Sequence, residues 1–279
     1  MAFHYTRAPI TQNTSTIALI GATLALGLVP AVHDAWRTVV ETVPEWALIV
    51  LVPWAGHQII FWASSWLALY VDKTDRPRFL ARHRIQSGKP QRPPMAKVIR
   101  NLAVNQLFWS PILLWAMWQV LRLRGWAPST DLPSAPSLLA EVAGMALASI
   151  VWFYASHRFL HRPWWMKRVH RVHHEFRTST VMASEYAHWL EFTVGNFMTL
   201  AIGILLIAPS LPALYLYTLL AIATFLAHHS GYALPWLSWS VHHDWHHYRY
   251  NEAFGTLGYI DRLLGTSKEL DAMQDGDTR

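Results

Sequence analysis

The sequence predicts an all-α integral membrane protein with a histidine-rich helical cap, and three observations lead to that fold class. Only 14% of the 279 residues are charged, while 53% are hydrophobic; soluble domains carry roughly 25% charged residues. Several apolar stretches approach the roughly 20 residues that a helix needs to cross a bilayer. Twelve of the 16 histidines lie between His157 and His247, and such a density is costly in a protein core unless the ring nitrogens are bound.

The apolar stretches predict about four transmembrane helices, at roughly 17–32, 46–70, 107–121 and 138–153. The first and third are short, which favours a tilted or re-entrant course. A fifth block, 192–227, has no charged residue and is interrupted near its middle by Pro209 and Pro212. Because proline ends one helix and allows the next to begin, this block predicts a re-entrant helical hairpin that enters and leaves on one side.

The charges predict the orientation. Residues 72–100 carry nine lysines and arginines against two aspartates, so the positive-inside rule places this loop in the cytoplasm. Both termini and all the histidine clusters then face the same side. Topology also accounts for most of the net charge of +6, so we expect no nucleic-acid partner.

One membrane-embedded domain is expected over 1–279. Its membrane helices and basic loop would occupy 17–155, and its histidine-rich catalytic region 156–266. The first apolar stretch lacks a convincing cleavage site for a signal peptide, so we expect it to be retained as a helix.

The histidines form three clusters, one H-x-x-x-H and two H-x-x-H-H. Residues at i, i+3 and i+4 share one face of a helix, so each cluster can direct its imidazoles toward a common centre. His188 and His229 lie beside predicted membrane boundaries. An isolated histidine is more often a core or interface residue than a metal ligand, but these two would complete a set of ten ligands. The predicted metal ligands are His157, His161, His170, His173, His174, His188, His229, His243, His246 and His247.

Ten imidazoles exceed the four positions of a tetrahedral zinc and suit two metals with about five nitrogen ligands each. Cysteine is absent, so histidine and carboxylate must do any metal binding. These residues do not exclude zinc. Iron is favoured if the site activates dioxygen, because that reaction needs a redox metal. Carboxylates near the ligands could accept the second ring N–H and orient each imidazole, and the candidates are Glu175, Glu185, Glu191 and Asp244.

The order of motifs is similar to that of a known superfamily. H-x-x-x-H, H-x-x-H-H, E-Y-A-H-x-x-E, H-S-G-Y, H-H-D-x-H-H, FGT and DRLLGT follow one another along the chain. This order resembles the fatty acid hydroxylase and sterol desaturase superfamily, and most closely its C-4 methylsterol oxidase and cholesterol 25-hydroxylase branch. The resemblance covers roughly 58–265. One departure is Trp189, where the family usually has proline after the histidine.

The resemblance implies a non-haem di-iron enzyme with its active site facing the cytoplasm, in the endoplasmic reticulum of a eukaryote or the cytoplasmic membrane of a bacterium. Dioxygen would be the co-substrate. The H-P-G-G haem-binding signature of cytochrome b5 is missing from the sequence. Electrons from NAD(P)H would therefore come through a separate donor, such as cytochrome b5 with its reductase or a ferredoxin.

The expected reaction is hydroxylation of an unactivated C–H bond in a sterol or terpenoid-like lipid that arrives from the bilayer. Repeated turnover could carry the product on to an aldehyde or acid, in sterol or specialised-metabolite biosynthesis. A desaturase acting on a sterol or fatty acyl lipid is the alternative within the superfamily. A non-catalytic metal-binding membrane scaffold is the alternative from another class.

Overall fold

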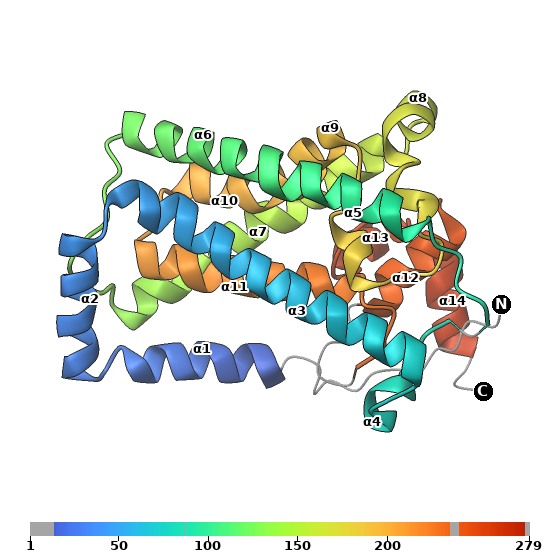
Figure 1. Ribbon diagram of the computed structural model, residues 1–279, viewed down its shortest axis with the longest axis horizontal. Helices are drawn as coiled ribbons and strands as arrows, with labels where there is room; N and C mark the ends of the chain where they lie inside the picture. Colours follow the sequence, from blue (N-terminus) through green and yellow to red (C-terminus); the bar gives the residue numbers. More distant parts are fainter. Residues whose placement is uncertain (1–13, 87, 235–239, 277–279) are drawn as a thin grey trace.

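The computed structural model describes residues 14–86, 88–234 and 240–276, and in these residues the chain is helical (Figure 1). The described part contains no β-strand, only an isolated bridge between Arg84 and Tyr232. The all-α prediction is therefore confirmed. In chain order the helices are α1 (Thr14–Leu26), α2 (Pro30–Thr42), α3 (Val52–Thr74), α4 (Arg78–Ala81), α5 (Met95–Ala103), α6 (Ser110–Leu123), α7 (Ala135–Leu160), α8 (Pro163–Trp165), α9 (Trp189–Glu191), α10 (Met198–Ile207), α11 (Leu211–His228), α12 (Ser240–Arg249), α13 (Tyr259–Leu264) and α14 (Lys268–Gly276). Tighter 3-10 or wider π-helical segments join several of them, namely η2 (Ala47–Leu51), η3 (Val104–Trp109), η4 (Met166–His170), η5 (His173–Glu175), η6 (Val181–Ser184) and η7 (Phe192–Phe197).

Four helical segments of the described chain are long and apolar enough to cross a membrane. They are Ala47–Thr74, Ala135–Leu160, Trp189–Ile207 and Leu211–His228. The protein is thus an integral membrane protein, as the composition predicts. The last two segments form the predicted hairpin, and each is long enough to be a complete crossing.

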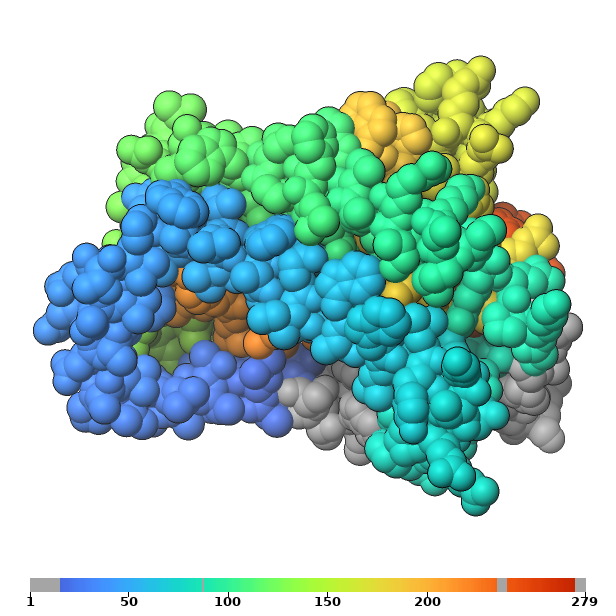
Figure 2. Space-filling model, viewed as in Figure 1, coloured from blue at the N-terminus to red at the C-terminus, as the bar shows by residue number. Residues whose placement is uncertain are grey.

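Two of the predicted spans differ in the structure. The first is broken into α1 and α2, which meet at 88° across the stretch between Gly27 and Pro30. Figure 2 shows the surface hollowed between α1 and α3. The third, 107–121, falls mostly in α6, which has only 14 residues and is not among the four candidate spans.

The ends of the membrane-crossing helices coincide with capping and turn residues in the sequence. The side chain of Ser134 accepts a hydrogen bond from the Ser137 backbone N–H and caps α7, with a proline in the first turn. Between α10 and α11, Ala208 adopts a left-handed conformation with φ of 51°, and Glu141 accepts hydrogen bonds from the backbone and hydroxyl of Ser210. These contacts fix the turn of the hairpin against α7.

Close packing of α7 against α10 sets the position of the histidines at the end of α7. A side-chain Cβ at Gly203 would lie 2.6 Å from the Cα of Met145, closer than packed atoms tolerate. Met145 is itself fully buried in the main core, together with residues of α6, α10 and α11. Glycine at position 203 therefore allows the two helices to touch along their backbones.

The basic loop 72–100 and the histidine-rich region lie at the same end of the bundle, where α4, α5 and α12 to α14 gather (Figure 1). Arg92 contacts Asp72 at 2.6 Å and donates to the backbone carbonyls of Thr178 and Ser179. Lys97 contacts the carboxylate of Glu175 at 2.6 Å. The loop is thus tied to the segment between the second cluster and the hairpin.

Candidate metal centre

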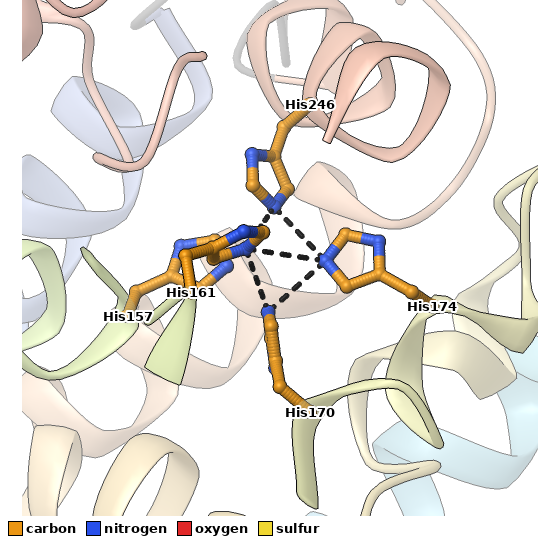
Figure 3. A group of neighbouring side chains, drawn as sticks. All are labelled: His157, His161, His170, His174 and His246. Atoms are coloured by element: carbon orange, nitrogen blue, oxygen red, sulfur yellow. Dashed lines mark hydrogen bonds between the residues drawn. The ribbon is translucent and has the colours of Figure 1, made fainter. Parts of the chain in front are cut away.

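Nine of the ten predicted ligands lie in two compact groups. In each group the candidate ligand atoms all lie within 4.8 Å of one another. The first group, shown in Figure 3, contains His157, His161, His170, His174 and His246. The second group contains His173, His229, His243 and His247.

The two H-x-x-H-H clusters divide between the groups in the same way. The i and i+4 members share a group, as His243 and His247 do, while the i+3 member, His246, joins the other group. The same division separates His170 and His174 from His173. On α12, one helical turn separates His243 from His247, whereas His246 is rotated to the neighbouring side of the helix. Each H-x-x-H-H cluster therefore contributes to both groups and holds them next to each other.

In the first group the ring Nε2 atoms converge on one point (Figure 3). The Nε2 of His170 lies 2.9 Å from that of His161 and 3.0 Å from that of His174. The Nε2 of His246 lies 3.1 Å from that of His161 and 3.2 Å from that of His174. The Nε2 of His157 is buried without a hydrogen-bond partner in the described structure.

The second group is built the same way from α11, α12 and the 3-10 turn η5. The Nε2 of His243 lies 2.8 Å from that of His229 and 3.2 Å from that of His247. The ring of His173 lies 4.7 Å from that of His247, between centroids. The groups are adjacent, since the ring centroids of His174 and His247 are 4.9 Å apart.

Backbone carbonyls fix the protonation of most of these rings. A carbonyl oxygen can only accept, so a ring whose Nδ1 contacts one must carry its proton on Nδ1 and a lone pair on Nε2. Such contacts, between 2.7 and 3.2 Å, hold the following rings: His157 to Phe254, His173 to Tyr186, His229 to Phe225, His246 to Glu252 and His247 to Phe176.

The consequence is a concentration of lone pairs that cannot hydrogen-bond one another. In the second group, three of the four Nε2 atoms must be acceptors, and they lie in a buried place. Converging acceptors repel unless a cation lies between them. The donor set therefore fits a metal ion in each group better than it fits a hydrogen-bonded histidine patch.

Burial keeps the imidazoles neutral, which is the form that binds metal. It lowers the pKa of His161 to about 2, with the neighbouring His157 adding to the effect, and lowers the pKa of His173 to about 4. Burial, and then the neighbouring histidines, also hold the pKa of His174 and His246 well below the usual value.

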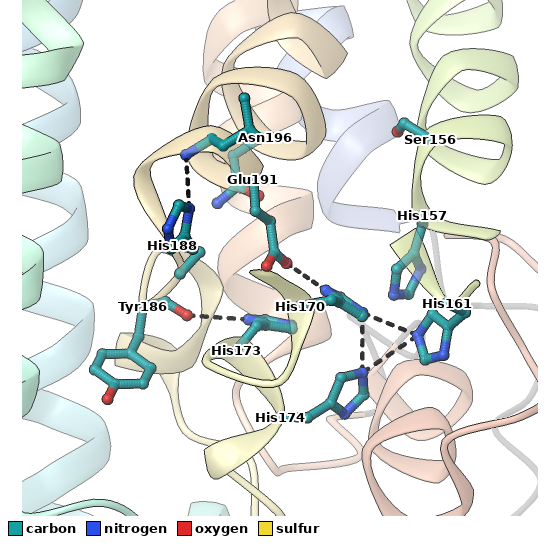
Figure 4. Close-up of polar contacts among 12 residues, drawn as sticks. Ser156, His157, His161, His170, His173, His174, Tyr186, His188, Glu191 and Asn196 are labelled. Carbon is teal, nitrogen blue, oxygen red and sulfur yellow. Dashed lines mark hydrogen bonds and ion pairs between the residues drawn. The ribbon is translucent and has the colours of Figure 1, made fainter. Parts of the chain in front are cut away.

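His188 lies outside both groups. It is the residue that caps α9, and its Nδ1 accepts a hydrogen bond from the backbone N–H of Leu190 at 3.2 Å. Figure 4 shows its ring apart from the cluster of His157, His161, His170 and His174. The residue after it, Trp189, stacks on Trp109 with ring centroids 5.2 Å apart.

Of the four predicted carboxylates, Glu191 contacts a grouped histidine in the described structure. It accepts from the Nδ1 of His170 at 2.6 Å (Figure 4). The other three bind elsewhere. Glu175 contacts Lys97 and the hydroxyl of Tyr186, Glu185 contacts His57 and Gln106, and Asp244 accepts from Gln86 at 2.8 Å. Burial raises the pKa of Asp244 to about 6.

Asp261 supports the site from the DRLLGT motif. Its carboxylate, fully buried, accepts hydrogen bonds from the backbone N–H groups of Phe254 and Gly255 at 2.8 Å. A Cβ at Gly255 would lie 2.5 Å from that carboxylate, so glycine is needed there. Since Phe254 also provides the carbonyl that holds His157, the FGT and DRLLGT motifs together orient a predicted ligand.

An apolar cavity adjoins the centre. Phe225 and Asn196 line both the space beside the histidines and a larger space between α3, α6, α10 and α11. The larger space is lined mostly by apolar side chains, and the polar residues in its walls are His57, Ser110, Glu185, Asn196 and Thr218. A lipid chain or ring system held there would lie next to the metal centre.

Comparison with known proteins identifies a matching family and several relatives of the chain. Residues 142–266 match the model of the family described as "Fatty acid hydroxylase". The chain is 34% identical, over 80% of its length and 68% of the relative, to "Fatty acid hydroxylase domain-containing protein 2" of Macaca fascicularis. It is 28% identical to "Methylsterol monooxygenase 2-2" of Arabidopsis thaliana, over 85% of this chain and 92% of the relative.

A third relative is named for a different activity. The chain is 28% identical to "Very-long-chain aldehyde decarbonylase GL1-11" of Oryza sativa subsp. indica, over 86% of this chain and 93% of the relative. No solved structure matches the chain. The chain belongs to the fatty acid hydroxylase family, within the superfamily of membrane-bound, oxygen-using oxidoreductases that also contains the sterol desaturases.

Proposed function

We propose that this protein is a non-haem di-iron oxygenase that hydroxylates an unactivated C–H bond of a sterol or terpenoid-like lipid. The observation that carries the proposal is the pair of buried histidine groups whose Nε2 lone pairs converge at the end of an apolar cavity. The names of the relatives support lipid oxidation, since they include a methylsterol monooxygenase. Residues 156–266 would form the catalytic region.

The nine grouped histidines would hold the two metal ions, five around one and four around the other. Iron pairs supply the redox chemistry with dioxygen that side chains cannot perform. Neither group includes a cysteine or a carboxylate, and an all-imidazole donor set suits iron as well as zinc. The oxygen-using family favours iron.

The chain's own residues would position the substrate and keep water out. The cavity beside the centre is apolar and lies between membrane-crossing helices, so a lipid could enter it from the bilayer without passing through water. Phe225, which lines both spaces, would lie between the bound lipid and the metals. Glu191 would keep the ring of His170 oriented by holding its Nδ1 proton.

The metal centre would face the cytoplasm, at the membrane of the endoplasmic reticulum or of a bacterium. The support is the packing of the basic loop 72–100 against the histidine-rich end, because positive loops stay on the cytoplasmic side. Electrons from NAD(P)H would arrive at this side through a separate protein, such as cytochrome b5 with its reductase or a ferredoxin.

Metal analysis combined with isotope-labelled turnover tests the proposal. Purified protein should contain about two irons per chain, and a sterol or terpenoid product should carry one atom from ¹⁸O-labelled dioxygen. A product that has lost two hydrogens and gained no oxygen would identify a desaturase instead. Undiminished turnover by iron-free protein would contradict the di-iron assignment.

Replacing Glu191 by glutamine is expected to weaken metal binding in the first group by about 10- to 100-fold, the usual effect of losing a partner that orients a ligand. The amide keeps an acceptor for His170 but loses the negative charge. Metal titration of the variant would measure the change. Glu175→Gln is the matched control, because Glu175 contacts Lys97 and Tyr186, and a similar loss in that variant would argue against a specific role for Glu191.

A further inference from the structure

Glu185 lies at the edge of the apolar cavity, and its carboxylate is fixed there by two hydrogen-bond donors. Its Oε1 contacts the Nε2 of His57 at 2.5 Å, and its Oε2 accepts from the side-chain amide of Gln106 at 2.6 Å. Glu185 and His57 are both mostly buried, with 15% and 16% of their side chains exposed. Neither side chain contacts a grouped histidine, so this pair is not part of the metal centre.

The direction of the hydrogen bonds around this pair can be worked out from one tryptophan. The indole N–H of Trp62 can only donate, and it contacts the side-chain oxygen of Gln58 at 3.3 Å. The amide nitrogen of Gln58 therefore faces the Nδ1 of His57, at 3.2 Å, and donates to it. The proton of His57 then lies on Nε2 and is donated to Glu185.

Glu185 is thus an acceptor fixed from two sides. A carboxylate has about four lone-pair sites, and the two contacts to His57 and Gln106 use two of them. The remaining acceptor capacity lies at a cavity whose other walls are mostly apolar, as at Phe192, Leu200 and Ile222, with Ser110, Asn196 and Thr218 as the other polar residues. A ligand that fills this cavity and offers one hydrogen-bond donor would satisfy it.

We propose that Glu185 recognises the hydroxyl group of a neutral lipid alcohol, whose apolar body fills the cavity. This inference rests on the proposed function in that it takes the cavity to be the substrate site. A ketone, ether or ester lacks the donor that Glu185 needs. A sulfate or carboxylate head group would be repelled by the negative charge.

The cavity runs from the metal centre into the bundle, which suits such a ligand. Along α11, Phe225 precedes His229 by four residues and Thr218 precedes it by eleven, and both line the cavity. At about 1.5 Å per residue, the cavity reaches from roughly 6 Å to roughly 16 Å from His229. Glu185 directly follows Ser184, which lines the space beside the histidines, so the hydroxyl would be bound near the centre and the apolar body farther inside.

Equilibrium binding to the purified protein, kept free of dioxygen and of electron donors so that no turnover occurs, tests the inference separately from the proposed function. The probe is tritiated 5α-cholestan-3β-ol, competed by the unlabelled alcohol, its 3-ketone, its 3-methyl ether and its 3-sulfate. A hydrogen bond to a charged acceptor is worth about 1.5–3 kcal/mol, so the alcohol should bind at least about 10-fold more tightly than the ketone or ether. A triterpenol and a long-chain fatty alcohol, each beside its own ketone or aldehyde and ether, extend the comparison to other carbon skeletons.

The variant Glu185→Gln should remove the preference while leaving ketone binding nearly unchanged. Its single remaining side-chain oxygen is needed by His57 or Gln106. The matched control is Glu141→Gln, because Glu141 contacts Ser210 outside the cavity, and this variant should keep the full preference.

Three results would overturn the proposal. They are equal binding of alcohol, ketone and ether by the unaltered protein, a preference that survives in folded Glu185→Gln, and no binding of any of the three alcohols. The comparison of ligands on the unaltered protein needs no variant to fold. Absence of iron or of turnover would count against the proposed function alone.

Discussion

Replacing His246 or His247 by alanine is expected to lower the metal content from about two ions per chain to about one, and replacing both should leave none. The two residues are adjacent on α12, yet His246 belongs to the first group and His247 to the second. Each variant removes one converging Nε2 from one group only. Turnover should fall by more than about 100-fold in either, because losing a ligand costs more than losing its outer partner. Metal analysis and product formation measure the two effects.

The control for these variants is His188→Ala. His188 lies outside both groups and caps α9 through its Nδ1, so its replacement should cost about 1 kcal/mol of stability and leave two metal ions bound. Loss of metal from His188→Ala would show that His188 becomes a ligand when the metal ions are bound. Loss of both ions from His246→Ala alone would argue against two separately held metals.

The histidine spacing was sufficient to predict that the clusters converge, since i and i+4 residues face the same way on a helix. It did not predict how the histidines divide between the groups. His170 ends a π-helical segment, and His173 and His174 begin a 3-10 turn, so the second cluster does not lie on a single α-helix. The division depends on how this irregular segment packs between α7 and α12, which is a tertiary property.

The carboxylates show why closeness in sequence is a weak guide to contact. Glu175 directly follows His174, yet its side chain turns to Lys97 and Tyr186. Glu191 is separated from His170 by 21 residues and lies 2.6 Å from it. Such pairs form only when the chain returns to the same place, and a single sequence carries no signal for that.

The predicted span at 107–121 is the clearest difference in the membrane region. Just before it, Asn105 and Gln106 are almost completely buried and hydrogen-bond the segment around Glu185 and Ala187. Their polar side chains serve the protein interior, so this helix is packed as part of the support for the site. A hydropathy pattern reports apolar content and does not distinguish packing against protein from contact with lipid.

Asp261 gives the second large expected effect, a loss of stability in the variant Asp261→Ala. The carboxylate accepts from the backbone of Phe254 and Gly255, from the hydroxyl of Thr266 at 2.7 Å and from the ring of His242 at 3.2 Å. Alanine would leave several buried donors without partners, and losing a buried charged acceptor costs about 3–5 kcal/mol. For a chain of this size we expect the thermal midpoint in one detergent to fall by roughly 10 °C.

The matched control is Asp271→Ala, which removes a carboxylate from α14. Asp271 contacts Arg262 and Ser267, and the side chain of Arg262 is 58% exposed. A pair so accessible to water contributes about 0–1 kcal/mol, so the midpoint should fall by no more than a few degrees. Asp261→Ala should also weaken metal binding in the first group, because the loop it releases carries the carbonyl of Phe254 that orients His157. A midpoint equal to that of Asp271→Ala, with full metal content, would show that the FGT and DRLLGT motifs do not hold the centre together.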